Sequence, residues 1–389
     1  MQAQEVGDPV RLFSSNAQGV PVHPAAGDNR YVRWANGTTG RISAIDAATG
    51  WIEVDAAGSS GWVTPRYVKV LASEEPEDGA LGTAIPVAVV GTWNLEWLKD
   101  GKSRGFPENT RGGPSYGART ADDYRRIAEV IETRLGASIM LLQEINGESG
   151  TRNSVEMNRL LGFLGEDWAY ELSASGGSQR VAILYDESAV RRNHCEEFQV
   201  PATKVQGSDI FARDPLACHL TFLDDSGAAR NDLLVVGLHL ASGQDKTRNH
   251  DQAMHTLRLR LRAALSGGTF PAGERDILLG GDLNANRYDS KPENFWQVAD
   301  PSGMSLGTLS PEDGEEYPGT RLAGVPLVPS SKIDYLLRVD RTGGLVDELV
   351  QHTAQVRLDL LPGNFNDFRR QLSDHIPVTV QIRIVPDDD

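Results

Sequence analysis

The sequence predicts an α/β protein preceded by a small all-β domain, and three observations support this assignment. The chain has 389 residues, which is too long for one ordinary domain and about right for two. Residues 1–72 hold short alternating segments separated by turns. From residue 85 onward, short buried strands alternate with amphipathic helices. No run of 18 or more apolar residues occurs, so no membrane span is expected.

The first 72 residues predict a small β-barrel. Turn signals such as Ala35-Asn36-Gly37 separate its strand-like segments. The segment 61–70, with the earlier Gly50-Trp51 pair, resembles the closing part of bacterial SH3-like domains. That resemblance implies a peptide or cell-wall ligand bound by exposed aromatic residues, although the tryptophans can equally form the barrel core. An acidic, Pro- and Gly-containing linker at 73–84 then leads to a catalytic domain at 85–389.

Net charge and cysteine content narrow the possible partners. The formal net charge of −16 argues against a broad basic surface and hence against strong nonspecific binding of nucleic acid. It does not exclude a nuclease, because bound cations supply positive charge where a phosphate sits.

Cys195 and Cys218 form no zinc motif. They either pair in an exported protein or stay as buried thiols, and we expect the unpaired form. The first residues show no signal peptide, which leaves a removed leader or a cytosolic start.

The stretch 276–286 is the centre of the predicted catalytic domain. An apolar strand ends at Gly280-Gly281, and Asp282 and Asn284 follow two residues apart. If the backbone stays extended, both side chains point the same way. A carboxylate and an amide at the mouth of a buried strand suit a hydrolytic site that binds phosphate and activates water. The alternative is a structural turn rich in Asp and Asn.

Other predicted strands also carry polar residues at their ends. The strand-like runs that lead to Asn94, Glu144 and His239 resemble the run before Asp282. Two further groups, Asp334 and the pair Asp374-His375, lie at or near strand starts. These residue types are the ones used for metal binding and proton transfer. We therefore expect several of them to converge at one edge of a sheet. Helices are predicted after Thr120, near 152–164 and near 247–265.

Six motifs, in this order, resemble those of the endonuclease/exonuclease/phosphatase superfamily. They are Thr92-Trp93-Asn94-Leu95-Glu96, Leu142-Gln143-Glu144, Gly237-Leu238-His239, Gly281-Asp282-Leu283-Asn284, Lys332-Ile333-Asp334-Tyr335 and Ser373-Asp374-His375-Ile376-Pro377. The resemblance implies the DNase-I-like fold, a four-layer α/β sandwich with two central mixed β-sheets. It also implies a phosphodiesterase that depends on a divalent metal.

The resemblance assigns the metal ligands. Glu144 is the main metal carboxylate, supported by Asn94, Glu96 and Asp374. A hard oxygen cage suits Mg²⁺, with Mn²⁺ and Ca²⁺ as alternatives.

The resemblance also assigns the groups around the phosphate. Asp282 and Asn284 orient the attacking water and hold the phosphate, and His375 is the general base or a phosphate ligand. Asp334 orients His375 and raises its pKa by favouring the charged ring. His239 faces the leaving-group side and binds the phosphate. If Gln179 rather than a carboxylate sits beside it, we expect His239 to stay mostly neutral at pH 7.

Within the superfamily, two segments favour the secreted deoxyribonuclease branch. They are Asp282-Leu283-Asn284-Ala285 and the run 211–215, which makes Arg213 a phosphate-ligand candidate. The alternative for Arg213 is an ordinary strand salt bridge. Two departures oppose the branch: Gln179 stands where a carboxylate would support His239, and Asn146 replaces a minor-groove arginine.

We therefore expect a nuclease acting on DNA or RNA, of bacterial type and secreted or periplasmic, with a cytoplasmic location left open. Its oligomeric state is not indicated by the sequence. The alternatives are a phosphatase, a phospholipid phosphodiesterase like bacterial sphingomyelinases, or an inactive binding scaffold. An inositol phosphatase is disfavoured, because the motif around Asp334 differs from that branch.

Overall fold

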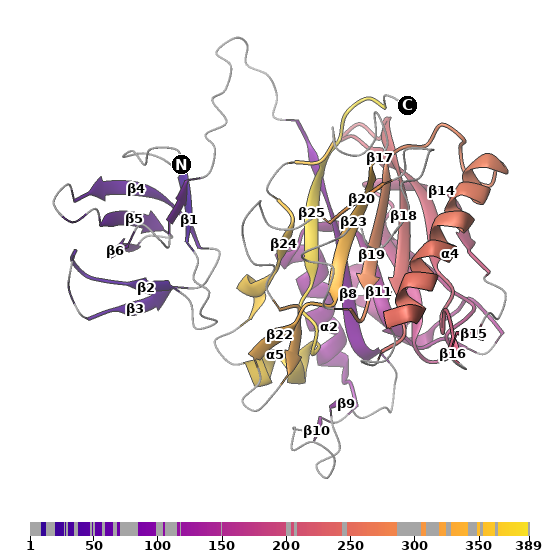
Figure 1. The fold of residues 1–389 in the computed structure, drawn as a ribbon, viewed down its shortest axis with the longest axis horizontal. Coiled ribbons are helices and arrows are strands. Elements are labelled where there is room, and N and C mark those ends of the chain that lie inside the picture. Colours follow the sequence, from indigo (N-terminus) through magenta and orange to yellow (C-terminus); the bar gives the residue numbers. More distant parts are fainter. Residues whose placement is uncertain are drawn as a thin grey trace. The chain divides into compact units, whose positions relative to one another are not determined.

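The structure is a computed structural model of the chain (Figure 1). The residues that it describes are 9–12, 20–26, 28, 30–34, 38–46, 49, 51–56, 59–64, 68–70, 85–98, 104–105, 115–116, 118–148, 150–199, 204–205, 208–242, 247–285, 305–308, 319–323, 328–340, 348–350, 353–361 and 365–387. The predicted linker at 73–84 lies outside these residues. The chain divides into two compact units, Met1–Thr83 with Leu358–Leu361, and Ala84–Arg357 with Pro362–Asp389.

The N-terminal unit is built from β-strands. Its five-stranded antiparallel sheet has the order β6-β5-β4-β1-β7. The strands are β1 (Pro9–Leu12), β4 (Thr39–Ile45), β5 (Ile52–Ala56), β6 (Ser59–Val63) and β7 (Val68–Val70), and a separate hairpin joins β2 (Val20–Val22) to β3 (Val32–Trp34). Valine, leucine and isoleucine side chains form its core, and the half-buried Trp34 packs against them. The relation to SH3-like domains stays a prediction.

The first sheet of the larger unit has the order β12-β13-β11-β8-β25-β24 and is mixed, because β8 and β11 run parallel. Its strands are β8 (Val87–Leu98), β11 (Ala137–Ile145), β12 (Trp168–Leu172), β13 (Arg180–Asp186), β24 (Gln355–Val356) and β25 (Val378–Arg383). Helix α2 (Ala121–Glu129) starts where predicted, since Thr120 and Asp123 form a capping box. It continues as a π-helical turn, Val130–Arg134, and α3 (Val155–Leu164) packs beside it.

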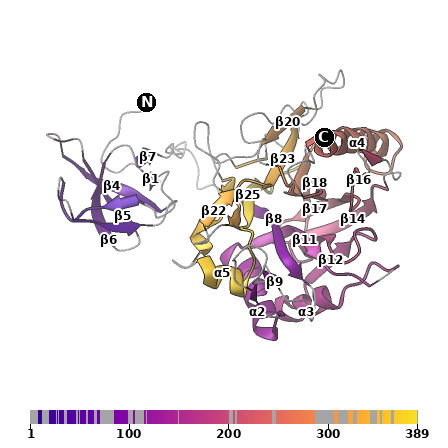
Figure 2. The same ribbon diagram turned by 60° about the horizontal axis from the view of Figure 1, so that its bottom comes forward.

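The second sheet has the order β14-β17-β18-β19-β23-β20, and its one parallel pair among the described strands is β18 with β19. The strands are β14 (Val190–Glu197), β17 (Leu216–Leu223), β18 (Ala229–His239), β19 (Ile277–Asp282), β20 (Ser305–Thr308) and β23 (Asp334–Asp340). The two sheets pack face to face, with α2 and α3 outside one and α4 (Thr247–Ser266) outside the other (Figure 2). The prediction of a four-layer α/β sandwich with two central mixed sheets is confirmed.

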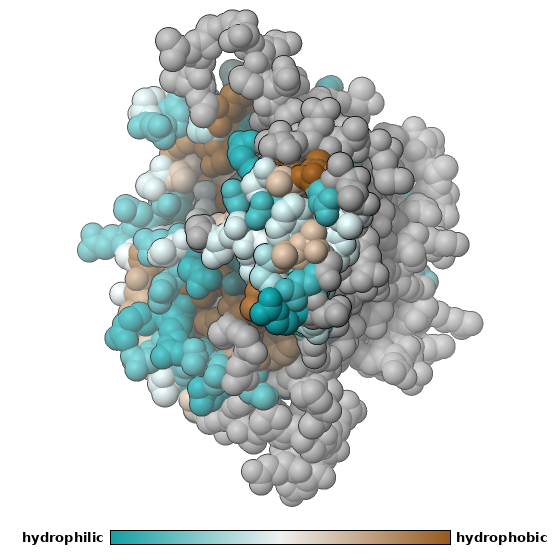
Figure 3. Space-filling model, turned by 90° about the vertical axis from the view of Figure 1, so that its left-hand side faces the viewer, coloured by the Kyte–Doolittle hydropathy of each residue, from teal (hydrophilic) through white to brown (hydrophobic). Residues whose placement is uncertain are grey.

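Short elements complete the larger unit. They are β9 (Arg104–Gly105), β10 (Ser115–Tyr116), β15 (Lys204–Val205), β16 (Ser208–Asp209), β21 (Arg321–Ala323), β22 (Val328–Ser331), a 3₁₀ turn Leu358–Leu360 and α5 (Phe365–Gln371). The run that begins at Phe211 looks strand-like in the sequence, but β17 begins at Leu216, because Pro215 cannot donate a ladder hydrogen bond. Among the described residues, no helix is long and apolar enough to cross a membrane. Figure 3 shows hydrophilic residues over much of the described surface on one face, with smaller hydrophobic areas between them.

The end of β19 requires a glycine. All six residues of this strand are buried, and Gly281 pairs with Leu238 of the parallel β18. Its φ is +156°, and a Cβ atom there would lie 1.9 Å from the carbonyl oxygen of Leu238. Glycine therefore allows the two strands to stay paired up to His239 and Asp282, which are direct partners in the register.

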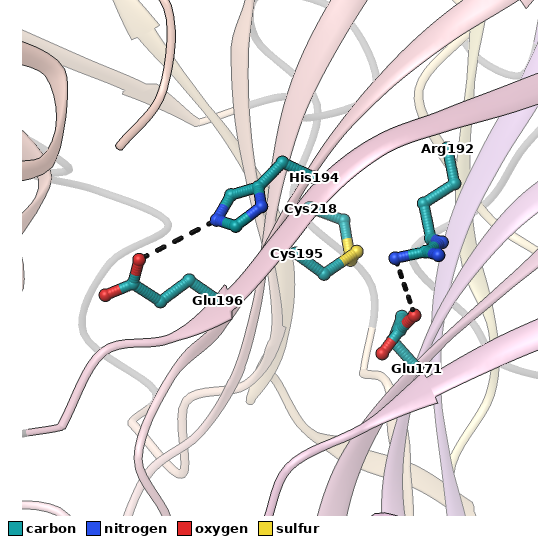
Figure 4. The surroundings of a disulfide bond; sticks show 6 residues. All are labelled: Glu171, Arg192, His194, Cys195, Glu196 and Cys218. Carbon is teal, nitrogen blue, oxygen red and sulfur yellow. Dashed lines mark ion pairs between the residues drawn. A yellow bond between two sulfur atoms is a disulfide. The ribbon is translucent and has the colours of Figure 1, made fainter. Parts of the chain in front are cut away.

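Cys195 and Cys218 form a disulfide, so the expectation of unpaired thiols is wrong (Figure 4). The antiparallel register of β14 and β17 places the two residues opposite each other, with their Cα atoms 4.1 Å apart. Strand β14 carries a run of exposed, mostly charged residues, which did not predict a strand. Beside the disulfide, Arg192 of β14 forms a 3.2 Å ion pair with Glu171 of β12, which links edge strands of the two sheets (Figure 4).

Removing this disulfide should destabilise the protein. Cross-linking residues 23 apart restricts the unfolded chain, and such a bridge contributes roughly 3 kcal/mol. We expect the Cys195→Ser, Cys218→Ser double variant to unfold at a lower denaturant concentration than the wild type. A reductant should lower the wild-type midpoint by a similar amount and leave the variant unchanged. If the wild-type midpoint does not respond to reductant, the two cysteines are not paired in solution.

Candidate active site

Asp282 lies at the centre of the site. This buried carboxylate ends β19, and its Oδ2 atom accepts a hydrogen bond from Asn94 Nδ2 at 3.0 Å. The same atom lies 3.7 Å from Nε2 of His239 and 3.8 Å from Nε2 of His375. Three of the residues predicted from strand ends and starts thus lie within 3.8 Å of Asp282.

Glu144 and Asn94 form the side of the site on the first sheet. Asn94 Nδ2 is 3.3 Å from Glu144 Oε1, and the backbone N–H of Trp97 donates to Glu144 Oε2 at 3.0 Å. The described non-glycine residues with positive φ are Glu96, Trp97, Glu144 and Asn284, with values of 43°, 57°, 62° and 49°. Such conformations cost of order 1–3 kcal/mol each and persist where the surroundings enforce them. All four residues lie at or beside the candidate site. We infer that the surrounding structure enforces this strained backbone because the site needs it.

Asn284 departs from the sequence-based expectation. The backbone does not stay extended after Asp282, because Asn284 has a left-handed φ of 49°. Its backbone N–H donates to Asp282 Oδ1 at 2.9 Å, which closes an Asx turn. Its side-chain Nδ2 donates to the carbonyl of Leu240 at 2.9 Å. Asn284 therefore holds the Asp282 carboxylate in place and ties it to the end of β18, while its predicted contact with phosphate stays a prediction.

Two arginines hold the remaining predicted metal ligands. Arg369 of α5 contacts Glu96 Oε1 at 2.7 Å and Asp374 Oδ2 at 3.6 Å. Arg321 of β21 contacts Asp374 Oδ2 at 3.2 Å through its Nε. The four predicted metal ligands therefore fall into two pairs. Asn94 and Glu144 lie next to Asp282, whereas Glu96 and Asp374 are bound by arginines. The sequence indicated neither arginine, because α5 and β21 are too short to show a periodic pattern.

His375 is held by several groups. Its Nδ1 lies 2.8 Å from Asp334 Oδ2 and 3.0 Å from Oδ1. Its backbone N–H donates to Ser373 Oγ, and its carbonyl accepts from Trp93 Nε1 at 2.9 Å. Asp334 is fixed in turn, since Thr320 Oγ1 accepts its backbone N–H at 3.0 Å. The contact that would orient His375 is therefore present, and the catalytic role of the pair stays a prediction.

The two histidines have opposite electrostatic surroundings. Burial disfavours the charged form of His375, but the carboxylates of Asp334 and Asp374 outweigh it and raise the pKa to about 10. Burial lowers the pKa of His239 well below its usual value, and the positive charges of Arg213 and His375 lower it further. The buried Nδ1 of His239 has no hydrogen-bond partner among the described residues. At neutral pH, His375 is thus cationic and His239 is neutral.

Asp282 has a strongly perturbed pKa as well. Burial and the negative charge of Asp334 raise it to about 7, although the charge of His375 and hydrogen bonds from Asn284 and Asn94 oppose the rise. A carboxyl group with this pKa exchanges a proton near neutral pH, which suits a general base.

Arg213 approaches the site from the segment before β17. Its Nε donates to the Gln179 carbonyl at 2.8 Å and its Nη2 to Gln179 Oε1 at 2.5 Å. Burial lowers its pKa, while the charges of Glu144 and Asp282 oppose that effect. Gln179 therefore supports Arg213, and within the described residues it makes no hydrogen bond to His239. No ion pair of Arg213 occurs among the described residues, so a salt-bridge role has no support there.

A four-layer sandwich with carboxylates, an amide and two histidines at its sheet ends defines a class of phosphoester hydrolases. The chain belongs to the Endonuclease/Exonuclease/phosphatase family, whose pattern matches residues 91–375. This confirms the superfamily to which the six motifs pointed, and the protein is accordingly an enzyme that hydrolyses phosphoesters. No curated protein sequence matches the chain.

Several solved structures are similar to the chain at low sequence identity. The human Nocturnin catalytic domain is 14% identical, with 77% of this chain and 96% of that one covered and a TM-score of 0.49. TDP2 from D. rerio, in complex with a single-strand DNA product, is 17% identical, covers 76% and 98%, and has a TM-score of 0.46. The mannosyl-6-phosphatase Bt3783 of Bacteroides thetaiotaomicron is 16% identical, covers 75% and 98%, and has a TM-score of 0.44.

Proposed function

We propose that the protein is a divalent-metal-dependent phosphodiesterase that hydrolyses nucleic acid, with DNA as the first candidate and RNA as the second. The observation that carries the proposal is the convergence on Asp282 of Asn94, His239 and His375. In this arrangement Asp282 can accept a proton, the ring of His239 is neutral and the ring of His375 is cationic, and the three side chains lie together. A phosphodiester under attack by water needs these three kinds of group.

The donor set fits a hard divalent cation. Glu144 supplies a carboxylate, and the Asn94 amide lies beside it with Nδ2 toward Glu144 Oε1. If this amide turns over, it offers its oxygen to the ion, and such oxygens suit Mg²⁺ and also Mn²⁺ and Ca²⁺. These two residues would hold the ion, and we retain Glu96 and Asp374 as further candidates although arginines bind them here. A cation held there would offset the charge that develops on the phosphate.

The protein groups divide the remaining work. Asp282, with a pKa of about 7, accepts the proton of the attacking water. His375 donates from its charged ring to a phosphate oxygen, and Asp334 holds that ring in one orientation. Neutral His239 binds a second phosphate oxygen or the leaving group, and Asn284 holds Asp282 in place. Arg213 interacts electrostatically with Glu144 and Asp282. Its guanidinium binds the phosphate from the side of the site formed by the segment before β17.

Substrate choice rests on the segment 282–285 and on Arg213, both of which resemble the deoxyribonuclease branch. Asn146 stands where that branch has a minor-groove arginine, and its amide is held by the Glu156 carboxylate at 3.0 and 3.1 Å. Insertion into a duplex groove from this position is therefore not part of the proposal. Single-stranded or locally opened DNA is the better candidate substrate.

Parallel assays test the proposal. Plasmid DNA, single-stranded DNA, RNA, bis-p-nitrophenyl phosphate, p-nitrophenyl phosphate and sphingomyelin should be compared with Mg²⁺ and with EDTA. We expect hydrolysis of DNA and of the small diester that EDTA abolishes. Hydrolysis of only the monoester would make the protein a phosphatase, and hydrolysis of only sphingomyelin a phospholipid phosphodiesterase. Absence of all hydrolysis would favour the binding scaffold.

The N-terminal unit should be dispensable for chemistry. All candidate site residues lie in the unit that starts at Ala84. A chain that starts at Ala80 should keep the full kcat/KM on bis-p-nitrophenyl phosphate. Loss of activity only on a large or surface-bound substrate would assign a docking role to the N-terminal unit, such as binding a peptide or the cell wall. A folded but inactive short chain would show that this unit completes the site.

We also propose that the protein works in a secreted or periplasmic setting. The Cys195–Cys218 disulfide supports this, because disulfides persist mainly in oxidising compartments. Thiol labelling of the protein from fractionated cells provides the test. Recovery in the reduced form from the cytoplasm would contradict the proposal.

A further inference from the structure

A second group of ionisable side chains lies at the other end of the second sheet. It consists of His219 on β17, Asp232 on β18 and Glu274 in the turn before β19, and we call it the His219 cluster. His219 Nε2 lies 2.7 Å from Asp232 Oδ2 and 3.0 Å from Glu274 Oε2. One nitrogen and two carboxylate oxygens thus lie within 4.8 Å of one another.

The register separates this cluster from the active site. Asp232 precedes His239 by seven residues on β18, a distance of about 23 Å along an extended strand. Glu274 likewise precedes the first residue of β19, whereas Asp282 is its last. The His219 cluster therefore takes no part in the chemistry proposed at Asp282.

The cluster is buried but accessible from one side. His219 is 6% exposed and Glu274 is 1% exposed, whereas the side chain of Asp232 keeps 21% of its surface. The other ring nitrogen of His219, Nδ1, lies 3.3 Å from Asn193 Nδ2, which also donates to Thr221 Oγ1. The ring is thus held with Nε2 facing the carboxylates. For Nε2 to bind a metal, the proton has to sit on Nδ1, and the Asn193 amide has to turn over so that its oxygen accepts that proton.

We propose that His219, Asp232 and Glu274 bind a zinc ion. One imidazole and two carboxylates form a borderline set of donors, which suits Zn²⁺ better than Mg²⁺. Ligand atoms about 2.1 Å from a tetrahedral centre lie roughly 3.4 Å from one another. The contacts of 2.7 and 3.0 Å need to open by about 0.7 and 0.4 Å to reach that value. The exposed side of Asp232 gives the ion a route in, and a water would be the fourth ligand.

Without zinc, a proton occupies the same position. Burial disfavours the charged ring of His219, but hydrogen bonds to Asp232 and Glu274 outweigh it and raise the pKa to about 9. A zinc ion there would join β17, β18 and the start of β19. The Cys195–Cys218 disulfide joins β14 to β17 one residue away, so four adjacent strands would be cross-linked at this end of the sheet.

Zinc binding by the full-length Glu144→Gln variant, whose proposed catalytic metal site is impaired, tests the inference. After incubation with Zn²⁺ and dialysis, we expect one equivalent of zinc by elemental analysis and a higher Tm than for the zinc-free protein. Adding His219→Gln or Glu274→Gln to this variant should weaken zinc binding by at least 10-fold and remove the Tm shift. In the same background, Co²⁺ should give the visible absorption of a four-coordinate site, and His219→Gln should abolish it.

His194→Gln is the matched control. His194 is the direct cross-strand partner of His219, but its side chain is 52% exposed, and its substitution should leave zinc binding unchanged. The inference is overturned if the Glu144→Gln variant binds no zinc at micromolar concentrations. It is also overturned if His219→Gln and Glu274→Gln retain the zinc of their parent. Neither outcome depends on whether the protein hydrolyses phosphodiesters, since no activity is measured.

Discussion

Replacing Asp282 with asparagine should lower kcat at neutral pH by about 10²–10⁴-fold, the usual contribution of a positioned general base. Asparagine cannot accept a proton from water, although it retains an oxygen for the backbone N–H of Asn284. The fold should not weaken. Burial raises the pKa of Asp282 to about 7, so its ionised form opposes folding above the unfolded pKa of 3.8, and a neutral amide removes that cost. The result to expect is an inactive enzyme with an equal or higher Tm.

Two further variants make this measurement decisive. Asp225→Asn, in the exposed turn between β17 and β18, changes the same charge and should leave both kcat and Tm unchanged.

Glu144→Gln should abolish turnover by a different route, because it removes the main candidate metal carboxylate. The affinity of the active site for zinc or Mg²⁺ should fall with it. Retained activity in either site variant, with a metal still required, would remove that residue from the site.

The residues that could be predicted from the sequence lie at the ends of long buried strands. Apolar runs whose burial is evident from their composition precede Asn94, Glu144, His239 and Asp282. The order of the six motifs along the chain then identified the fold. Arg321 and Arg369 could not be found in this way. They come from β21 and α5, elements of three and seven residues, and they reach the site only because the tertiary fold brings them to Asp374.

Backbone conformation was the second source of error. A period-two pattern assumes an extended chain, and Asn284 breaks that assumption with a left-handed φ that its Asx turn to Asp282 stabilises. The disulfide was not predicted either. The pairing of Cys195 with Cys218 depends on the register of β14, and the charged, exposed face of this strand hides it in the sequence. Local sequence indicates which strands are buried, but cross-strand partners follow from the assembled sheet.

Asp334→Asn should move both limbs of the pH–rate profile to lower pH. In the wild type, Asp282 has to lose its proton and His375 has to keep its own, which places the active range between about 7 and about 10. The charge of Asp334 raises the pKa of both groups. Its removal lowers the pKa of Asp282, so the acidic limb moves down, and lowers the pKa of His375, so the alkaline limb moves down too. The maximal rate should fall as well, since the amide orients the ring of His375 less firmly.

The profile also separates two roles for His375. If its neutral ring were the general base, the wild-type rate would still be rising at pH 9, and Asp334→Asn would be more active than the wild type near neutrality. If the charged ring binds the phosphate, the wild-type rate declines as the pH approaches 10, and the variant has a lower maximal rate with its optimum moved to lower pH. Measuring kcat/KM for bis-p-nitrophenyl phosphate from pH 5 to pH 10.5, with Asp225→Asn as control, distinguishes these outcomes. Unmoved limbs with a normal rate would show that Asp334 does not control His375, and the assignment of a cationic phosphate ligand would then have to be withdrawn.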